Sequence, residues 1–147
     1  MIRPAQQQEA EAVRDVVHAA YQHYVARIGK PPGPMLDDYA ARIARGEAWV
    51  LQDAGRIVGI LVLEEQPDRF MLDNIAVRPD CQGCGFGRAL MAFAEAEARR
   101  RGWHEIVLYT HVMMTENQVL YRRLGYLETG RVAEKGFERV YMRKALD

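Results

Sequence analysis

The segment that most constrains the fold spans residues 72–90 and places three glycines within five positions. Residues 70–77 are mostly apolar and predict a buried strand, and residues 85–101 predict a long amphipathic helix. Gly83, Gly85 and Gly87 lie at the junction, where they leave backbone N–H groups uncovered by side chains. The helix start adds unpaired N–H groups and the positive end of its dipole. The junction therefore predicts an anion site, most naturally for phosphate.

Two common phosphate-binding motifs do not fit this junction. A P-loop requires a lysine after its second glycine, and no lysine follows these glycines. The dinucleotide fingerprint Gly-x-Gly-x-x-Gly also fails, because its last position holds Arg88 or Leu90. What remains is the pattern Q-x-x-G-x-G at 82–87 after an apolar strand. A plain tight turn between strand and helix is the alternative interpretation.

Length and charge limit the class of protein and its partners. The 147 residues suit a single domain spanning 1–147. With 20 basic and 20 acidic residues the formal net charge is +0, so no nucleic-acid partner is expected. No apolar run is long enough to span a membrane, and the first residues lack a signal-peptide pattern. We therefore expect a cytoplasmic protein without a membrane partner.

Cys81 and Cys84 form a Cys-x-x-Cys pair inside the glycine turn. A structural zinc site needs four ligands, and these are the only 2 cysteines. His104 and His111 are too widely spaced for a standard histidine pair, so no metal site is predicted. A redox dithiol stays open, because a helix N-terminus lowers a thiol pKa. The other interpretation is two small residues tolerated in a crowded turn.

The remaining elements follow from periodicity and turn residues. Residues 9–24 predict an amphipathic helix, 27–35 a loop rich in proline and glycine, and 37–45 a short helix. The predicted strands are 2–3, 48–51, 57–63, 70–77, 106–109, 126–132 and 137–146, and a further helix begins at Thr115 or Asn117 and ends at Gly125. The sequence thus predicts a mixed α/β (α+β) fold, with a right-handed crossover through the long helix.

This order of elements, over essentially the whole chain, resembles the GNAT superfamily of acetyl-CoA-dependent N-acetyltransferases. Strand 72–77 followed by Q-x-x-G-x-G-R at 82–88 is similar to the family's central strand and pyrophosphate loop. The motif N-x-x-x-Y-x-x-x-G-Y at 117–126 is similar to its later helix. R-I-G at 27–29 with P-G-P-M at 32–35 is similar to the substrate-side loop of a bacterial subgroup.

The resemblance implies a mixed central sheet of about six to seven strands flanked by about four helices, and acetyl-CoA as the cofactor. In the family the central strand splays from its neighbour, so pantetheine pairs with the backbone of Ile75, Ala76 and Val77. The pyrophosphate takes N–H groups between Gln82 and Arg88, a stretch that includes Gly83, Cys84, Gly85, Phe86 and Gly87. Asn117 is expected on the same helix face as Tyr121, or as a helix cap.

The implied activity is direct transfer of an acetyl group from acetyl-CoA to a primary amine in a ternary complex. Tyr121 is expected to protonate the leaving thiolate, the alternative being a core tyrosine. The Val77 N–H is expected to polarise the thioester carbonyl. Asp73 and His111 are candidate bases, although Asp73 could be a structural acceptor and His111 an ordinary loop histidine. Glu64, Glu65 or a water chain are further options.

The acceptor side is expected to include His23, Tyr24, Arg27 and the proline-glycine loop. A carboxylate such as Asp73 near the thioester would suit a small amine, and Arg27 would suit an acceptor that also carries a carboxylate. The acceptor is thus a small-molecule or peptide amine that the sequence does not specify. Two other functions stay open: a non-catalytic acyl-CoA sensor or interaction module on the same fold, and thiol-redox chemistry. A homodimer through a terminal strand or the sheet edge is compatible with the sequence.

Overall fold

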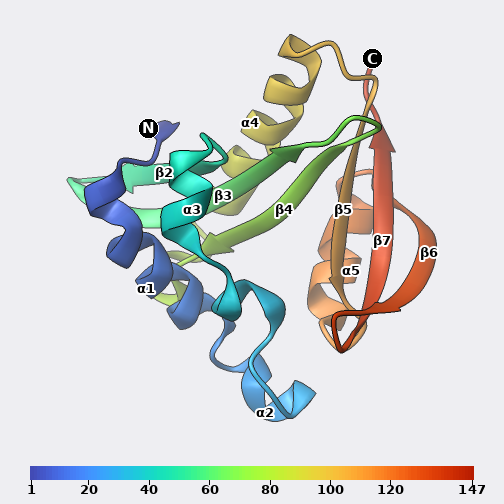
Figure 1. Cartoon of the computed structure of the whole chain (residues 1–147), viewed down its shortest axis with the longest axis horizontal. Coiled ribbons are helices and arrows are strands. Elements are labelled where there is room, and N and C mark those ends of the chain that lie inside the picture. Colours follow the sequence, from blue (N-terminus) through green and yellow to red (C-terminus); the bar gives the residue numbers. More distant parts are fainter.

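The computed structural model describes residues 1–147, which form one seven-stranded sheet and five α-helices (Figure 1). The strands are β1 (Ile2–Pro4), β2 (Ala48–Asp53), β3 (Arg56–Glu65), β4 (Phe70–Val77), β5 (Glu105–His111), β6 (Leu127–Glu134) and β7 (Phe137–Ala145). The helices are α1 (Ala10–Tyr21), α2 (Tyr24–Ile28), α3 (Tyr39–Ala44), α4 (Phe86–Arg100) and α5 (Thr115–Arg123). The sheet order is β1-β2-β3-β4-β5-β7-β6, with β4 and β5 as the one parallel pair. The predicted mixed sheet is confirmed.

Helices cover both faces of the sheet, which explains why β3 is apolar along most of its length (Figure 1). On one face, Ile60 and Val62 share an apolar core with α1 and α3. On the other face, Leu61 and Leu63 share a second core with α4. All four strand residues are at most 2% exposed. A strand between two helical layers has no solvent face, so polar residues do not alternate along it.

The helix predicted for residues 9–24 is divided in the structure. α1 ends at Tyr21, and α2 follows after a turn and is ended by Gly29, whose φ is +90°. The structure therefore has five helices instead of about four, and the proline-glycine loop begins at Gly29 rather than at residue 27. No proline or glycine marks the break. Tertiary packing accounts for it, because Tyr24 is only 5% exposed and its ring centroid lies 6.2 Å from that of Tyr21.

β4 and β5 diverge after a short ladder, as the two strands at the centre of Figure 1 show. Met71 pairs with Val107 and Leu72 pairs with Leu108, and no later residue of β4 pairs with β5. Beyond these two pairs, the side of β4 that faces away from β3 has no strand beside it. The expected splaying of the central strand is therefore present.

A β-bulge lies where the divergence begins. Leu72 pairs with Leu63 of β3, whereas Asn74 pairs with the adjacent residue Val62, so Asp73 is an extra residue in β4. A bulge bends its strand, re-aims a side chain and is common beside active sites. Here it starts the divergence of β4 from β5 and directs Asp73 toward α3.

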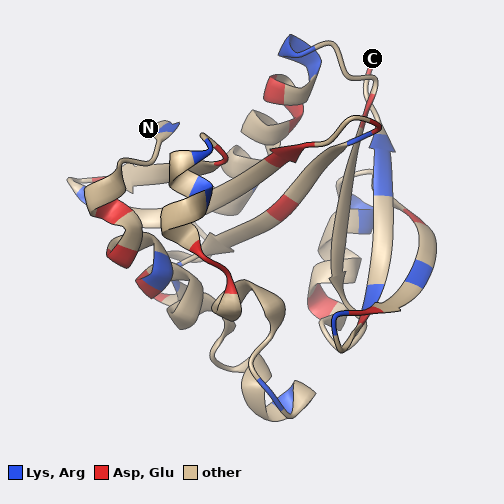
Figure 2. Cartoon of the chain, viewed as in Figure 1, with Lys and Arg blue, Asp and Glu red and all other residues tan.

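Charges of both signs are interspersed over the elements, in line with the formal net charge of +0 (Figure 2). β6 carries one basic residue, Arg131, and β7 carries Arg139, Arg143 and Lys144. Arg131 and Arg143 are exposed, whereas Arg139 is only 8% exposed. None of the helices has both the length and the apolar character needed to cross a membrane.

Candidate active site

A cleft of about 750 Å³ opens where β4 leaves β5. Its walls come from the end of β4, the glycine turn, the start of α4, the segment joining α1 to α2, and α5. The predicted cofactor residues that line it are Ile75, Ala76, Val77, Gln82, Gly83, Gly85, Phe86, Gly87, Arg88 and Asn117. The predicted residue Cys84 does not line it. The cleft thus gathers residues from the two separate sequence motifs.

The glycine turn presents six consecutive backbone N–H groups, from Gly83 to Arg88, that donate to nothing within the chain. The next amide, that of Ala89, donates to the Gly85 carbonyl at 3.0 Å and begins the helical ladder. These N–H groups coincide with the N-terminus of the 15-residue helix α4, where the helix dipole is positive. Unpaired donors and a positive dipole end together form a site for an anion such as a pyrophosphate.

The backbone of the turn requires glycine at position 85 but not at position 87. Gly85 has a φ of +82°, in the left-handed region, where any side chain is strained. A Cβ on Gly87 would lie 4.0 Å from Cγ2 of Val77, which is an ordinary van der Waals contact. The packing of the chain therefore tolerates a side chain at position 87. A ligand bound against the turn would be a reason for glycine at this position.

The two cysteines of the turn are free thiols, one half-buried and one exposed. Burial raises the pKa of the Cys81 thiol, and the charge of Asp80 adds to the effect. The thiolate is the reactive form, so a raised pKa is the opposite of what redox chemistry at Cys81 requires. No group of three or more His, Cys, Asp and Glu side chains is placed to hold a metal ion.

The backbone of β4 offers free donors to the cleft. Arg78 N donates to the Val58 carbonyl at 2.8 Å, and hydrogen bonding alternates along an antiparallel pair. The N–H groups of Val77 and Ile75 therefore point away from β3, toward the side that β5 has left. The carbonyl of Ile75 on that side accepts a hydrogen bond from the Tyr21 hydroxyl at 3.1 Å.

Tyr121 of α5 stands at the inner end of the cleft. Its side chain is 6% exposed, and its hydroxyl makes no hydrogen bond within the chain although it lines the cleft. Burial raises the pKa of this phenol well above its ordinary value, so the hydroxyl keeps its proton at neutral pH. Asn117 lies one turn earlier on the same helix face and lines the same cleft. Its amide contacts only Sδ of Met114, at 3.7 Å.

A second, smaller cavity of about 30 Å³ lies beyond Tyr121. It is bordered by the bulge of β4, the ends of β5 and β7, and the loop Pro32–Pro34. Both cavities share Tyr21, Ile75, Asn117 and Tyr121 in their linings. Tyr121 thus lies where a molecule in the cleft would meet a molecule in the second cavity.

Asp73, the predicted base on the bulge, borders this second cavity. Its Oδ2 accepts from Nη2 of Arg42 at 3.1 Å, and its Oδ1 accepts from the Tyr109 hydroxyl at 3.2 Å. Burial raises the pKa of Asp73, and the positive charge of Arg42 opposes the rise. Asp73 is the one carboxylate in the lining, because neither Glu64 nor Glu65 reaches this cavity.

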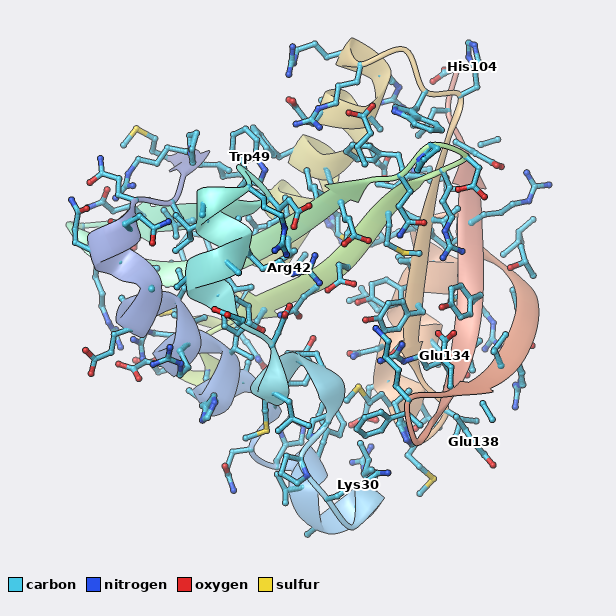
Figure 3. The ribbon with its side chains drawn as sticks, viewed as in Figure 1. Lys30, Arg42, Trp49, His104, Glu134 and Glu138 are labelled. Carbon is cyan, nitrogen blue, oxygen red and sulfur yellow. The ribbon has the colours of Figure 1, made fainter.

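Arg42 of α3 is the centre of an ion-pair cluster that the sequence did not reveal. Besides Asp73, it binds Asp37 at 2.9 Å, Glu47 at 3.1 Å and Glu64 at 3.0 Å. Figure 3 shows it beneath α3 and over the central strands, and its side chain is 11% exposed. An arginine on a short amphipathic helix predicts a solvated residue, so the pattern gave no signal for this role.

His111, the other predicted base, also borders the second cavity. Nδ1 of its ring accepts the Met113 N–H at 3.0 Å, so the neutral ring carries its proton on Nε2. Burial lowers the pKa of His111 below its ordinary 6.5, which keeps the ring neutral at pH 7. In this arrangement the ring offers a hydrogen-bond donor. It could take up a proton only by releasing Met113.

None of the three residues predicted for the acceptor side lines the second cavity. His23 and Tyr24 line the large cleft and not the second cavity. Arg27 lines neither, because its Nη1 binds Glu116 at 2.6 Å and the Met113 carbonyl at 3.2 Å. The second cavity is bordered instead by residues that sequence reasoning missed, namely Tyr21, Asn74, Tyr109, Phe137 and Arg139. Their strand positions were predicted, but nothing in the sequence showed that they converge.

Comparison with known proteins adds independent information. Residues 44–128, more than half of the chain, match the family model described as acetyltransferase (GNAT) domain. N-acetyltransferase family 8 member 2 of Rattus norvegicus is 31% identical over 93 residues, which are 59% of this chain and 41% of that protein. A mycothiol acetyltransferase of an Arthrobacter species is 30% identical over 132 residues, 81% of this chain and 39% of that protein. The chain spans about two fifths of the length of each relative.

Solved structures share the fold over the full length of the chain. The PaiA N-acetyltransferase of Thermoplasma acidophilum, solved in complex with coenzyme A, superposes with a TM-score of 0.82 at 17% identity. The superposition covers 99% of this chain and 98% of that one. At this level of identity the likeness concerns the fold alone.

Proposed function

The chain belongs to the GNAT acetyltransferase domain family, and on this premise we propose that it transfers the acetyl group of acetyl-CoA to a primary amine. The observation that carries the proposal is the junction at Tyr121, where the large cleft meets the second cavity. A donor and an acceptor can be bound there together, which favours direct transfer in a ternary complex.

The large cleft is the proposed site of acetyl-CoA. Its volume of about 750 Å³ falls in the range of cofactor sites. The six free N–H groups of residues 83–88 suit the pyrophosphate, and Arg88 adds a positive charge beside them. The free N–H group of Val77 suits an amide carbonyl of the pantetheine arm. Acetyl-CoA supplies an activated thioester, and the chain binds, orients and polarises it.

The acid and the carbonyl donor of the proposed reaction both come from residues at the junction of the two cavities. The Ile75 N–H is the proposed donor to the thioester carbonyl, because it has no partner in the sheet and Ile75 lines both cavities. Val77, the donor expected from the sequence, lines the large cleft alone. The Tyr121 hydroxyl is the proposed acid that protonates the departing thiolate. Its position at the junction supports this role, since Tyr121 lines both cavities and its hydroxyl makes no hydrogen bond within the chain.

Asp73 is the proposed acceptor of the amine's proton. Deprotonating an alkyl ammonium with a pKa near 10.4 costs about 4–5 kcal/mol at pH 7. A nearby base that accepts this proton therefore makes the amine available for attack on the thioester. Asp73 borders the acceptor cavity, and burial raises its pKa toward that of a useful base. His111 is less suited, because its Nδ1 already accepts the Met113 N–H.

The test is release of free CoA from acetyl-CoA in the presence of polyamines, amino acids, aminoglycosides or lysine peptides. Wild type is compared with Tyr121→Phe and with the control Tyr126→Phe, since Tyr126 lines neither cavity and its hydroxyl donates to Glu95. We expect release that depends on the acceptor. We also expect kcat to fall about 100-fold or more in Tyr121→Phe and to change little in the control.

Two other outcomes would contradict the proposal in different ways. Thermal stabilisation by acetyl-CoA without release to any amine would favour a non-catalytic acyl-CoA sensor on this fold. The absence of both release and thermal stabilisation would remove the assignment of the cleft to acetyl-CoA. Unchanged kcat in Tyr121→Phe would remove the acid role alone.

A further inference from the structure

Arg139 is a buried charge in the second cavity that the proposed transfer does not use. It lies on β7, paired in register with His111 of β5, and its side chain is 9% exposed. It lines the second cavity together with Asp73 and Tyr121. Burying a guanidinium costs several kcal/mol unless its donors find partners. For a buried arginine, the hydrogen-bond partner of each N–H donor therefore needs to be identified.

The guanidinium of Arg139 is held in one orientation. Its Cζ lies over the Tyr109 ring, 4.2 Å from the centroid, which is a cation–π contact. One corner is fixed by Glu134, whose Oε1 accepts from Nη1 at 3.1 Å. Glu134 itself also accepts from the Tyr141 hydroxyl, and Figure 3 shows it beside β7. The cation–π contact and a single ion pair thus hold the group while leaving its remaining donors unused.

The opposite edge of the guanidinium has no partner in the chain. Its Nε and Nη2 atoms make no hydrogen bond, whereas Nη1 makes one. These two unpaired atoms are not fully buried. Trp49 Nε1 is the one fully buried side-chain N or O atom without a hydrogen-bond partner, so the Nε and Nη2 atoms of Arg139 must reach open space. The loop residue Gly33 passes beside Nη2, and a Cβ there would lie 3.2 Å from it. Gly33 lines the same cavity, so the free edge borders the space proposed for the acceptor.

The charges around the second cavity are separated in a way that suits a zwitterion. Asp73 supplies a carboxylate on the β4 side, and Arg139 supplies a cation on the β7 side. Tyr109 lies between them, since its hydroxyl binds Asp73 and its ring supports Arg139. Asp73 and Arg139 both contact the same tyrosine, so the two charges of a ligand held between them must lie close together.

Resting on the proposed function, we infer that the Nε–Nη2 edge of Arg139 binds a carboxylate of the acceptor. The acceptor is then a compact amine that carries a carboxylate near its amino group, of the amino-acid class. Two parallel N–H donors on one edge match the two oxygens of a carboxylate, which a lysine could not do. The sequence predicted that Arg27 would bind an acceptor carboxylate, but Arg27 is paired with Glu116 at the surface. In this inference Arg139, 112 positions later, binds the carboxylate instead.

The test uses matched acceptors with wild-type protein. Each of the 20 common amino acids is compared with its own carboxamide, which keeps the amine and removes the negative charge, and with polyamines. The expected result is acetylation of at least one amino acid with a kcat/KM about 10- to 100-fold above that of its amide. Equal or better use of the amides, or transfer to polyamines alone, would overturn the inference. This comparison needs no variant, so it holds even if Arg139 is needed for folding.

Variants then assign the preference to the residue. Arg139→Gln is expected to remove the preference for the acid, mainly through KM, and Arg139→Lys to restore only part of it. Arg143→Gln is the matched control, because Arg143 lies four residues along β7 and pairs with Glu105 at the surface. A preference that survives in folded Arg139→Gln would overturn the assignment. Equal transfer to amino acids and to their carboxamides would contradict this inference alone. No release of CoA with any acceptor would contradict the proposed function as well.

Discussion

The hydroxyl of Tyr109 donates to Oδ1 of Asp73 across 3.2 Å, from β5 to the bulge of β4. This bond spans the two strands just after their ladder ends. It fixes the orientation of the carboxylate, while Arg42 holds its other oxygen. The proposed base is therefore positioned from both sides of the strand gap, which is what precise proton transfer requires.

Replacing the two glycines separately should distinguish strain from ligand contact. Gly85→Ala is expected to lower stability by about 1–2 kcal/mol, because an L-residue is disfavoured at a φ of +82°. Gly87→Ala is expected to keep or slightly raise stability but to weaken CoA binding about 10-fold or more. Urea denaturation and calorimetric titration with CoA measure the two effects. Equal CoA affinity of Gly87→Ala and wild type would show that the anion does not bind against that residue.

Asp73→Asn should lower kcat/KM about 100-fold if the carboxylate is the base. The stability of Asp73→Asn relative to wild type should also increase with pH. Burial raises the pKa of Asp73 in the folded state, so ionisation of this group disfavours folding. The melting temperature of the variant minus that of wild type should therefore increase as pH rises from below 3.8 through the raised pKa. A difference that decreases over this window would mean that Arg42 outweighs burial.

His111→Gln should leave kcat/KM within about 10-fold of wild type, because its Nδ1 is occupied by Met113. The pKa of His111 is lowered from 6.5, so protonation favours the unfolded chain. Its contribution to stability is present above pH 6.5 and is lost as pH falls toward the lowered value. Denaturant midpoints at pH 5 and pH 8 should therefore differ less in the variant than in wild type. A loss of activity as large as that in Asp73→Asn would make His111 the base.

Arg42→Met should destabilise the protein by about 3 kcal/mol, since it leaves Asp37, Glu64 and Asp73 without their cation in a partly buried place. Arg45→Met is the control on the same helix end, because Arg45 is 53% exposed and bonds only Glu47. Its effect should lie within about 0.5 kcal/mol. Urea denaturation at pH 7 compares the two variants. Equal effects would show that the cluster around Arg42 does not stabilise the fold.

The sequence predicted those features that depend on neighbouring residues. The apolar run of β4, the glycine turn and the periodicity of α4 are local signals, and all three elements form where expected. The break between α1 and α2 was not predicted, because it depends on how Tyr24 packs and not on a proline or glycine. Local patterns contain no information on such a contact.

The same limit applies to the site. Asp73, Asn117 and Tyr121 were predicted from a motif or a strand position, and the structure brings all three to the second cavity. Arg42 and Arg139 were missed, since a charged residue in an amphipathic pattern predicts solvent exposure. Their burial arises from acidic and aromatic partners distant in sequence, such as Asp73 for Arg42 and Tyr109 for Arg139. Only the folded arrangement shows these pairs.

The short ladder between β4 and β5 has a mechanical consequence. With only the pairs at Met71 and Leu72, the two halves of the sheet are joined at this seam by little backbone hydrogen bonding. A ligand that pairs with Ile75 and Val77 would continue the ladder and join the halves along the seam. Amide deuterium exchange at these two positions should then slow on binding of acetyl-CoA, and the donor would serve for one catalytic cycle as a temporary strand of the protein.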